Sequence, residues 1–269
     1  MFDTTEKVLK EWLALGEEAA RAGANVLEDW RHRFSVKEKS PSDLVTDADF
    51  AAQHIIRSII LNACPDHHFM GEEDTPGTVK GRVALDAPPT WIVDPLDGTA
   101  NYAHDVPCYC VSIGLIYQGR LLIGVIYDPR QKEMFLAAHG QGATLNGKTI
   151  VTSTFTQLRN CLISTGFPPN HEAQERNLHW WRTLSFRAQA LRRTGSTALN
   201  LAYVAAGRFD AYWAFDNYAW DVAAGIVLVQ EAGGIVTRAN GSAIDPFYPD
   251  ILATNGPIHQ EFLNILTAQ

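Results

Sequence analysis

Apolar residues recur at every third or fourth position across the start of the chain, and this spacing puts them on one face of a long amphipathic helix. The residues of this face are Val8, Trp12, Leu15, Ala19, Ala22, Val26 and Trp30. A second helix is predicted after Thr46, because a threonine hydroxyl accepts a hydrogen bond from a backbone N–H group at a helix start. Its first turn carries Asp47 and Asp49, and it should end before Pro65.

Shorter apolar runs predict β-strands through the rest of the first half. These runs cover residues 67–71, 91–94, 111–117, 121–127 and 133–138. The polar turn at 118–120 predicts that two of them form a hairpin. Residues 72–89, by contrast, are rich in glycine and proline and have no apolar period, so we expect them to form a mobile loop.

Helices and strands alternate in the second half of the chain. Strands are predicted at 161–165, 188–191, 209–213, 235–237 and 251–253, and helices at 171–184, 198–206, 221–232 and 258–266. This mixture of helix pairs and sheets predicts a layered α+β or α/β sandwich. We expect two lobes, 1–150 and 151–269, that meet near residues 145–160 and form a single structural unit.

The composition narrows the class of protein and of partner. The 269 residues are 46% hydrophobic and 19% charged, as in an ordinary globular protein. A formal net charge of −8 argues against nucleic acid and anionic lipid as partners, and it implies that a cation must bridge any anionic substrate to the protein. The sequence lacks the apolar run of about 18 residues that a membrane helix needs, and its charged N-terminal segment does not resemble a signal peptide, so we expect a cytoplasmic protein.

Two aspartates at the end of one predicted strand form the strongest candidate for chemistry. The apolar residues 91–93 run directly into Asp94, Pro95, Leu96, Asp97, Gly98 and Thr99. Pro95 bends the chain, so that both carboxylates can point into one space with the Leu96 carbonyl turned toward it. Free backbone N–H groups at a helix start after Gly98 could bind phosphate oxygens. Carboxylates beside an anion site indicate a cation between them, and hard oxygen ligands favour Mg²⁺, Mn²⁺ or Ca²⁺ over zinc.

Three further acidic groups would each be ordinary if they stood alone. Glu72 and the two acids after it follow a predicted strand, and acidic runs at the start of a loop are usually solvated. Asp221 opens an apolar helix, where an aspartate is a common N-cap. Asp49 lies in an acidic helix start, for which the same explanation holds.

Together, and across most of the chain, these groups resemble the motifs of the inositol monophosphatase family. The matching strings are Asp43-Leu-Val-Thr-x-x-Asp49, Gly71-Glu72-Glu73, Asp94-x-x-Asp97-Gly-Thr99 and Trp220-Asp221-x-Ala-Ala-Gly225. The segment from Gly195 to Asn200 is similar to the substrate-side loop of that family. Asn101-Tyr102 looks more like its inositol phosphatase branch than its 3′-nucleotidase branch. The resemblance covers about residues 36–260.

The resemblance implies an α/β fold, a layered α/β/α/β/α sandwich, that is usually a homodimer. It also implies Mg²⁺-dependent hydrolysis of phosphomonoesters with two or three metal ions. By position in the motifs, Glu72, Asp94 and the Leu96 carbonyl would hold the first ion. Asp94, Asp97 and Asp221 would hold the second, and Glu72 would also reach a weaker third ion.

The same resemblance implies roles on the substrate. Thr99, oriented by Asp49, would help to activate the attacking water together with Glu72. Backbone N–H groups of Gly98 and Thr99 would bind the phosphate. The residues expected to face the rest of the substrate are Asp97, Asp221, Gly195, Ser196 and Thr197.

One position departs from the family pattern and leaves the substrate open. Inositol-hydrolysing relatives often carry a glutamate seven residues before the Trp-Asp aspartate, where it binds sugar hydroxyls, but this chain has Ala214 there. Asp216 or Asn217 could take its place, or both could lie in a solvated turn. The expected substrate is an inositol monophosphate or a related small sugar or polyol phosphate. Histidinol phosphate, fructose 1,6-bisphosphate and a 3′-phosphonucleotide are alternatives, as is a regulatory binding protein with this fold and no turnover.

Overall fold

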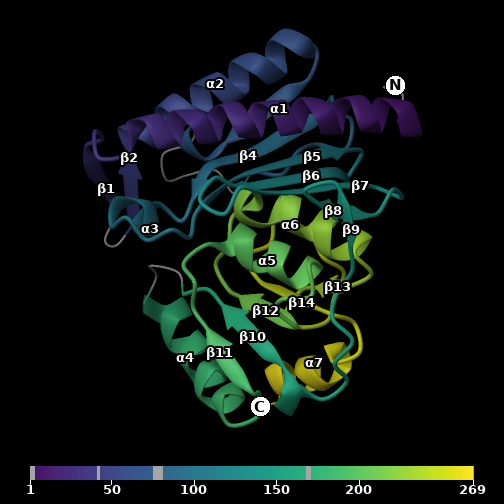
Figure 1. Ribbon diagram of the computed structural model, residues 1–269. Coiled ribbons are helices and arrows are strands. Elements are labelled where there is room, and N and C mark those ends of the chain that lie inside the picture. The colour runs from purple at the N-terminus through teal and green to yellow at the C-terminus, as the bar shows by residue number, and fades with distance from the viewer. Residues whose placement is uncertain (1–3, 41–42, 75–80, 168–170, 269) are drawn as a thin grey trace.

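The structure is a computed structural model that describes residues 4–40, 43–74, 81–167 and 171–268. Its elements form five layers, in which helices and sheets alternate and the outermost layers are helical (Figure 1). This confirms the predicted α/β fold with its α/β/α/β/α order. The seven-stranded and the five-stranded sheet are each covered by helices on both faces, which explains why their central strands are apolar on both sides. Among the described helices, none is long and apolar enough to cross a membrane.

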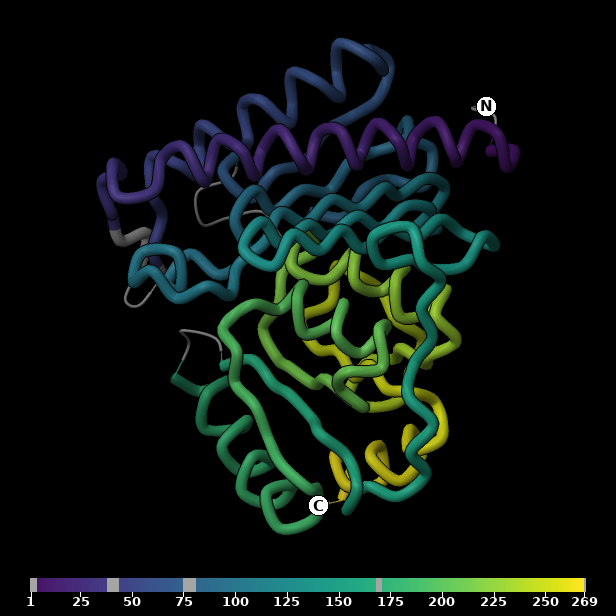
Figure 2. Tube along the Cα trace, viewed as in Figure 1, coloured from purple at the N-terminus to yellow at the C-terminus, as the bar shows by residue number. Residues whose placement is uncertain are grey.

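Helices α1 (Glu6–Trp30) and α2 (Asp47–Ala63) form the first outer layer. Figure 2 shows α1 lying lengthwise across one face of the first sheet, with α2 beside it. Trp12 and Ala19 of the predicted apolar face are buried against that sheet. Thr46 caps α2 as predicted, because its hydroxyl accepts a hydrogen bond from the Ala48 N–H group at 3.2 Å.

The first sheet contains seven strands in the order β3-β4-β5-β6-β7-β8-β9. Their bounds are β3 His68–Gly71, β4 Thr90–Asp97, β5 Cys110–Tyr117, β6 Arg120–Asp128, β7 Glu133–Ala138, β8 Ala143–Leu145 and β9 Lys148–Ile150. β3 and β4 are parallel, and the later neighbours pair antiparallel, including the predicted β5–β6 hairpin. Because Gly71 pairs with Val93, the residues that follow them, Glu72 and Asp94, lie at the same edge of the sheet.

Helices α5 (Thr197–Ala205) and α6 (Ala219–Glu231) fill the middle layer between the two sheets. Both helices are apolar nearly all round, as a helix buried on all sides must be. Gly124 of β6 faces α6 so closely that a Cβ there would lie 2.4 Å from the Ala224 carbonyl oxygen. The absent side chain lets the helix and sheet backbones approach each other.

The second sheet contains five strands in the order β11-β10-β12-β14-β13. Their bounds are β10 Leu162–Thr165, β11 Ala190–Arg192, β12 Ala211–Ala214, β13 Ile235–Thr237 and β14 Ile251–Thr254. Helices α4 (His171–Ser185) and α7 (His259–Thr267) cover its outer face, and a 3₁₀ turn, η2 (Leu158–Asn160), precedes β10. β10 is parallel to both β11 and β12, so these three strands end at one edge.

The apolar pattern does not predict every element. A two-stranded antiparallel ribbon, β1 (Val36–Ser40) and β2 (Asp43–Thr46), joins α1 to α2. β4 is longer than predicted and continues from Asp94 to Asp97. Its pairing with β5 is irregular between these two residues. The helix start expected after Gly98 is the short helix α3 (Thr99–Ala103). Of the loop expected at 72–89, the first three residues form a 3₁₀ helix, η1 (Glu72–Asp74), and 75–80 lie outside the described residues.

Candidate active site

The carboxyl end of β4 carries the two aspartates of the central motif. Asp94 is buried, and its Oδ1 accepts a hydrogen bond from the Leu96 N–H group at 2.9 Å. Asp97 is buried as well and ends the strand. Gly98 follows with a φ of 102°, and a Cβ there would lie 2.9 Å from the Cys108 carbonyl oxygen. Glycine is therefore required at the step from β4 into α3.

Glu72 approaches Asp94 from the neighbouring strand. It opens the 3₁₀ helix after β3, and its negative charge raises the pKa of Asp94, because the two carboxyl groups are close in the fold. Gln53 of α2 holds this turn, since its Oε1 accepts from the Glu73 N–H group and its Nε2 donates to Asp74 Oδ1, each at 3.0 Å. Sequence reasoning missed Gln53, although a glutamine on the buried side of a helix is itself a signal of a polar partner.

Asp97 is held by the N-terminus of α5. Its Oδ2 accepts hydrogen bonds from the Ser196 hydroxyl at 2.5 Å and the Ala198 N–H group at 2.6 Å, and its Oδ1 accepts from the Thr197 N–H group at 3.2 Å. The Ser196 hydroxyl also accepts from the Leu199 N–H group at 3.2 Å, which caps the helix. The structure thus brings the expected substrate-side loop directly against the expected metal ligand.

Thr99 and Asp49 meet between α3 and α2. The Thr99 hydroxyl lies 3.4 Å from Asp49 Oδ1 and 3.1 Å from the Leu96 carbonyl oxygen, and its single proton can go to one of them at a time. Asp49 Oδ2 accepts from the Thr46 N–H group at 2.9 Å and from its hydroxyl at 2.5 Å. Asp49 therefore completes the cap of α2 and also reaches Thr99.

Asp221 lies in the first turn of α6. Its Oδ2 accepts a hydrogen bond from the Tyr218 N–H group at 2.7 Å, so the capping explanation is correct for one of its oxygens. Its charge also raises the pKa of Asp94, because the two carboxyl groups are close in the fold. The structure therefore assembles Asp221 with the residues of β4 rather than leaving it at an isolated helix start.

Burial and mutual repulsion raise the pKa values of the aspartates in this cluster. Burial raises the pKa of Asp94 well above its usual range, and the negative charges of Glu72, Asp97 and Asp221 raise it further. Burial raises the pKa of Asp97 to about 6, against the lowering effect of its hydrogen bonds. The pKa of Asp49 rises to about 7, first through burial and then through Glu72. A cation among these groups would favour their ionised forms.

The donor set suits a hard divalent cation. Four carboxyl groups and the Leu96 carbonyl offer only oxygen atoms, which Mg²⁺ prefers. Within the described ranges, however, no group of three or more acidic, histidine or cysteine side chains already has the arrangement of a metal site. Both oxygens of Asp97 and one oxygen of Asp221 accept hydrogen bonds from backbone N–H groups. Carboxylate oxygens keep further lone pairs for a ligand, so the residues present fit such an ion.

The ends of β10 and β12 form the side of the cluster that is expected to face the substrate. The Thr197 hydroxyl lies 3.0 Å from the hydroxyl of the buried Tyr212. A Cβ on Gly166 would lie 2.9 Å from that tyrosine oxygen, 3.7 Å from the Ala214 Cβ and 3.8 Å from Thr197 Oγ1. These four residues therefore surround one small region beside Asp97. Sequence reasoning missed Gly166 and Tyr212, because the contacts that bring them together join segments that are distant in the sequence.

The side chain of Asn177 on α4 connects the ends of β10 and β12. It is fully buried, and its Nδ2 donates to the Gly166 carbonyl oxygen at 2.7 Å and to Thr165 Oγ1 at 3.0 Å. Its Oδ1 accepts from Trp213 Nε1 at 2.6 Å. One side chain thus joins the ends of β10 and β12, and the sequence gives no sign of this because the contact is between distant segments.

Asn101 and Gly195 hold the loop before α5. Asn101 Nδ2 donates to the Thr194 carbonyl oxygen at 2.9 Å and to the Cys108 carbonyl oxygen at 2.7 Å. Gly195 has a φ of 93°, and a Cβ there would lie 2.7 Å from the same amide nitrogen. Asn101, which the resemblance connects with the inositol branch, therefore positions the loop.

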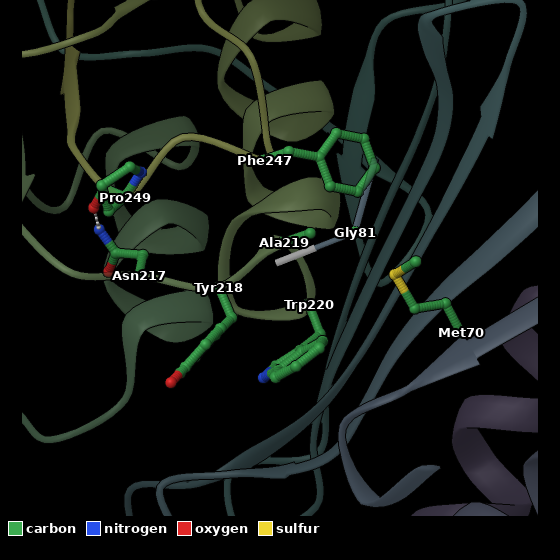
Figure 3. A pocket seen from close by; sticks show the side chains of 8 residues that line it. All are labelled: Met70, Gly81, Asn217, Tyr218, Ala219, Trp220, Phe247 and Pro249. Carbon is green, nitrogen blue, oxygen red and sulfur yellow. Dashed lines mark hydrogen bonds between the residues drawn. The ribbon is translucent and has the colours of Figure 1, made fainter. Parts of the chain in front are cut away.

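A small apolar pocket lies beside Trp220 at the start of α6 (Figure 3). The Tyr218 and Trp220 rings stack with centroids 4.8 Å apart at its wall. The backbone N–H group and Nδ2 of Asn217 both donate to the Pro249 carbonyl oxygen, at 2.8 and 2.9 Å. Asn217 is thus engaged in a loop contact, and none of the described residues that line the pocket carries a charge that could bind phosphate.

Comparison with known proteins agrees with these motifs. Residues 8–269 match the model of the inositol monophosphatase family. An inositol-1-monophosphatase from Synechocystis sp. is 43% identical over 97% of this chain and 90% of its own length. Extragenic suppressor protein suhB from Bartonella henselae has a similar structure, with a TM-score of 0.88 and 36% identity, over 96% of this chain and 98% of that one. For inositol monophosphatase from Anabaena the TM-score is 0.82 and the identity 37%, over 96% of both chains. This chain belongs to the inositol monophosphatase family.

Proposed function

We propose that the protein is a Mg²⁺-dependent phosphomonoesterase that hydrolyses inositol monophosphate or a related small sugar or polyol phosphate. The observation that carries this proposal is the burial of Asp94 among Glu72, Asp97 and Asp221, a set of like charges that calls for a cation. Family membership supports phosphatase activity. Relatives named inositol-1-monophosphatase support inositol monophosphate in particular, whereas the suhB name of a similar structure leaves the substrate open.

We assign the metal ligands by motif and by the contacts around β4. Glu72, Asp94 and the Leu96 carbonyl hold one ion, and Asp94, Asp97 and Asp221 hold a second. Glu72 also serves a weaker third ion. When bound, these ions neutralise the phosphate charge and lower the pKa of the attacking water.

The protein's own groups position the reactants. The Thr99 hydroxyl is held by its contacts with Asp49 and the Leu96 carbonyl. Its oxygen can therefore accept a hydrogen bond from the attacking water and orient that water. Glu72 assists as a base, and the N–H groups of Gly98 and Thr99 bind phosphate oxygens. The sequence contains no Gly-x-Ser-x-Gly string, so the proposed reaction is direct hydrolysis without a covalent phosphoenzyme.

The substrate specificity, the oligomeric state and the cellular location of the protein also belong to this proposal. Ala214 cannot accept a hydrogen bond from a sugar hydroxyl, so discrimination among polyols should be broad. Thr197 supplies one hydroxyl at the same place, paired with Tyr212. We further propose a cytoplasmic homodimer that acts on a small phosphorylated substrate and binds neither nucleic acid nor membrane, in keeping with the net charge of −8.

The test is phosphate release from a substrate panel with Mg²⁺ and with excess EDTA. The panel contains inositol 1-phosphate, histidinol phosphate, fructose 1,6-bisphosphate and a 3′-phosphonucleotide. Turnover should disappear with chelator and return with Mg²⁺, and Asp94→Asn should be the most damaging single change because Asp94 serves two ions. Turnover that persists in EDTA would contradict the metal mechanism. A folded protein with no Mg²⁺-dependent release from any substrate would instead favour a regulatory binding protein.

A further inference from the structure

Three polar side chains lie on one face of α2, next to the candidate active site. Asp49, Gln53 and Arg57 are four residues apart, and residues at this spacing are neighbours on a helix surface. Asp49 and Gln53 are buried, and buried polar side chains have hydrogen-bond partners. The carboxyl group of Asp49 contacts Thr99, so this polar face of α2 begins in the candidate active site.

Gln53 and Asp74 hold the turn that carries Glu72. Gln53 Oε1 accepts a hydrogen bond from the Glu73 N–H group, and Gln53 Nε2 donates to Asp74 Oδ1, each at 3.0 Å. Asp74 Oδ2 accepts from the Gly71 N–H group at 3.2 Å. The residues on both sides of Glu72 are therefore tied to one buried amide group and one carboxylate.

Arg57 holds Asp74 from the outer side. Its guanidinium group donates a hydrogen bond to Asp74 Oδ2, and its guanidinium carbon lies 4.5 Å from the ring centroid of Phe69 on β3. A guanidinium group stacked on an aromatic ring keeps its N–H groups available for a carboxylate. A chain of contacts thus runs from β3 through Arg57 and Asp74 to Gln53.

The space around Gln53 admits its amide group and little else. A Cβ on Gly71, the last residue of β3, would overlap this amide group, so glycine leaves the room that the amide occupies. A carboxylate at position 53 could accept from the Glu73 N–H group but could not donate to Asp74. It would also add a negative charge beside Asp49 and Glu72. Both the shape and the neutral charge of glutamine therefore suit this place.

We propose that Gln53 is a positioning residue that acts through Glu73 and Asp74 to hold Glu72 toward Asp94, and that it thereby sets the affinity for the metal ions that Glu72 serves. This inference rests on the proposed phosphomonoesterase activity and its metal ligands. Because Gly71 pairs with Val93, the Glu72 turn lies at the same edge of the sheet as Asp94. A turn that is already held in place does not have to be ordered when the ion binds, so less conformational entropy is lost.

The experiment titrates Mg²⁺ against the wild type, Gln53→Leu and Gln53→Glu. One readout is the Mg²⁺ concentration that gives half of the maximal thermal stabilisation without substrate, and it does not depend on turnover. The other is the Mg²⁺ concentration for half-maximal kcat on the best panel substrate, with KM for that substrate measured at saturating Mg²⁺. Both variants should raise both Mg²⁺ midpoints by about tenfold and leave KM for the substrate nearly unchanged.

A double variant tests the hydrogen bond between Gln53 and Asp74 directly. In Gln53→Glu combined with Asp74→Asn, the new amide can donate to the new carboxylate, its oxygen can still accept from Arg57, and the total charge equals that of the wild type. Its Mg²⁺ midpoints should return to within about threefold of the wild-type values. Asn62→Asp is the matched control, because it makes the same change from amide to carboxylate at an exposed position on α2, and its midpoints should equal those of the wild type.

A merely structural role would give a different result. Gln53→Leu would then lower the melting temperature equally with and without Mg²⁺ and leave both midpoints unchanged, which would overturn the inference but not the proposed function. If Gln53→Leu does not fold, Arg57→Met decides instead: it keeps the packing on Phe69 and loosens Asp74, so the midpoints should rise by about threefold, and unchanged midpoints would overturn the inference.

The wild type separates this inference from the proposed function. Stabilisation by Mg²⁺ without phosphate release from any panel substrate would contradict the phosphatase proposal alone, and the thermal midpoints of the variants would still decide the role of Gln53. A wild type that Mg²⁺ neither stabilises nor activates would contradict both.

Discussion

The Ser196 hydroxyl donates a hydrogen bond to Asp97 Oδ2 at 2.5 Å and accepts one from the Leu199 N–H group at 3.2 Å. This one side chain therefore connects the end of β4 in the first sheet with the N-terminus of α5 in the middle layer. Asp97 contributes a charged acceptor to the same helix start, where its carboxylate is favoured by the helix dipole. A proposed metal ligand and the cap of a core helix are thus one structural feature.

Ser196→Ala should destabilise the protein by about 1–2 kcal/mol, because it removes both a helix cap and a hydrogen bond to a buried carboxylate. The free energy of unfolding from urea denaturation measures the effect. Ser196→Thr is the control, since it retains a hydroxyl at the cap. An Ala variant as stable as the wild type would show that the two hydrogen bonds contribute little.

Thr99→Ala should lower kcat by roughly 100-fold while changing KM little, because the hydroxyl acts on the attacking water and not on the sugar. Thr99→Ser keeps the hydroxyl that contacts Asp49 and the Leu96 carbonyl, so it should retain most of the activity. Steady-state kinetics on the best panel substrate decide this. A rise in KM alone would mean that Thr99 binds the substrate instead.

Asp128 gives a pH dependence of stability that is separate from the proposed metal ligands. It is fully buried at the end of β6, where Oδ1 accepts from the Arg130 and Gln131 N–H groups at 2.8 and 2.9 Å. Its Oδ2 has no hydrogen-bond partner among the described residues. Burial raises the pKa of Asp128 to about 6, against these N–H contacts, and the charges nearest to it belong to Glu133, Arg208 and Glu28.

The folded protein therefore retains the Asp128 proton between about pH 4 and pH 6, where the unfolded chain has released it. Stability from this group is present below that window and is lost as the pH rises through it. Asp128→Asn cannot ionise, so its stability relative to the wild type should increase from pH 4 to pH 7 by about 1–3 kcal/mol. Asp86→Asn, at an exposed position, controls for the loss of one charge. A parallel pH profile for Asp128→Asn and the wild type would contradict the assignment.

The placement of Asp94 and Asp97 at the end of one strand could be predicted from the sequence, because it depends on residue types at short spacing. Asp94 and Asp97 follow an apolar strand, and the glycine after them has the left-handed φ that the turn needs. The α1 face was predictable for a similar reason, since burial against a sheet imposes its period on Trp12 and Ala19. In both cases the determining information lies within a single segment.

Contacts between distant segments could not be predicted in this way. Asn177 joins β10 to β12, and Tyr212 pairs with Thr197, but neither residue has a local pattern that differs from an ordinary helix or strand. The β1–β2 ribbon was also missed, because Val36–Ser40 is a mostly charged and polar strand without alternating apolar residues. These features depend on packing that becomes definite only in the folded chain.

Ala214 remains the most informative position for specificity, because it lies buried next to Gly166 and close to the Thr197–Tyr212 hydroxyl pair. Ala214→Glu supplies a carboxylate that can accept hydrogen bonds from ring hydroxyls. We expect it to improve kcat/KM for inositol 1-phosphate by about 1–2 kcal/mol if the carboxylate meets two hydroxyls. The gain should be smaller for substrates that lack a hydroxyl at that place.

Ala214→Gln is the matched control, since it has nearly the same shape as Ala214→Glu without the charge, and it should keep part of the gain on inositol 1-phosphate. Kinetics of the wild type and both variants on inositol 1-phosphate, with a thermal unfolding check, measure this. If the wild type is strictly selective for inositol 1-phosphate and Ala214→Glu lowers that activity, the ring is recognised by other residues. Thr197 and Asp216 would then be the next positions to substitute, because a wild type that already discriminates must place its acceptors elsewhere around the same region.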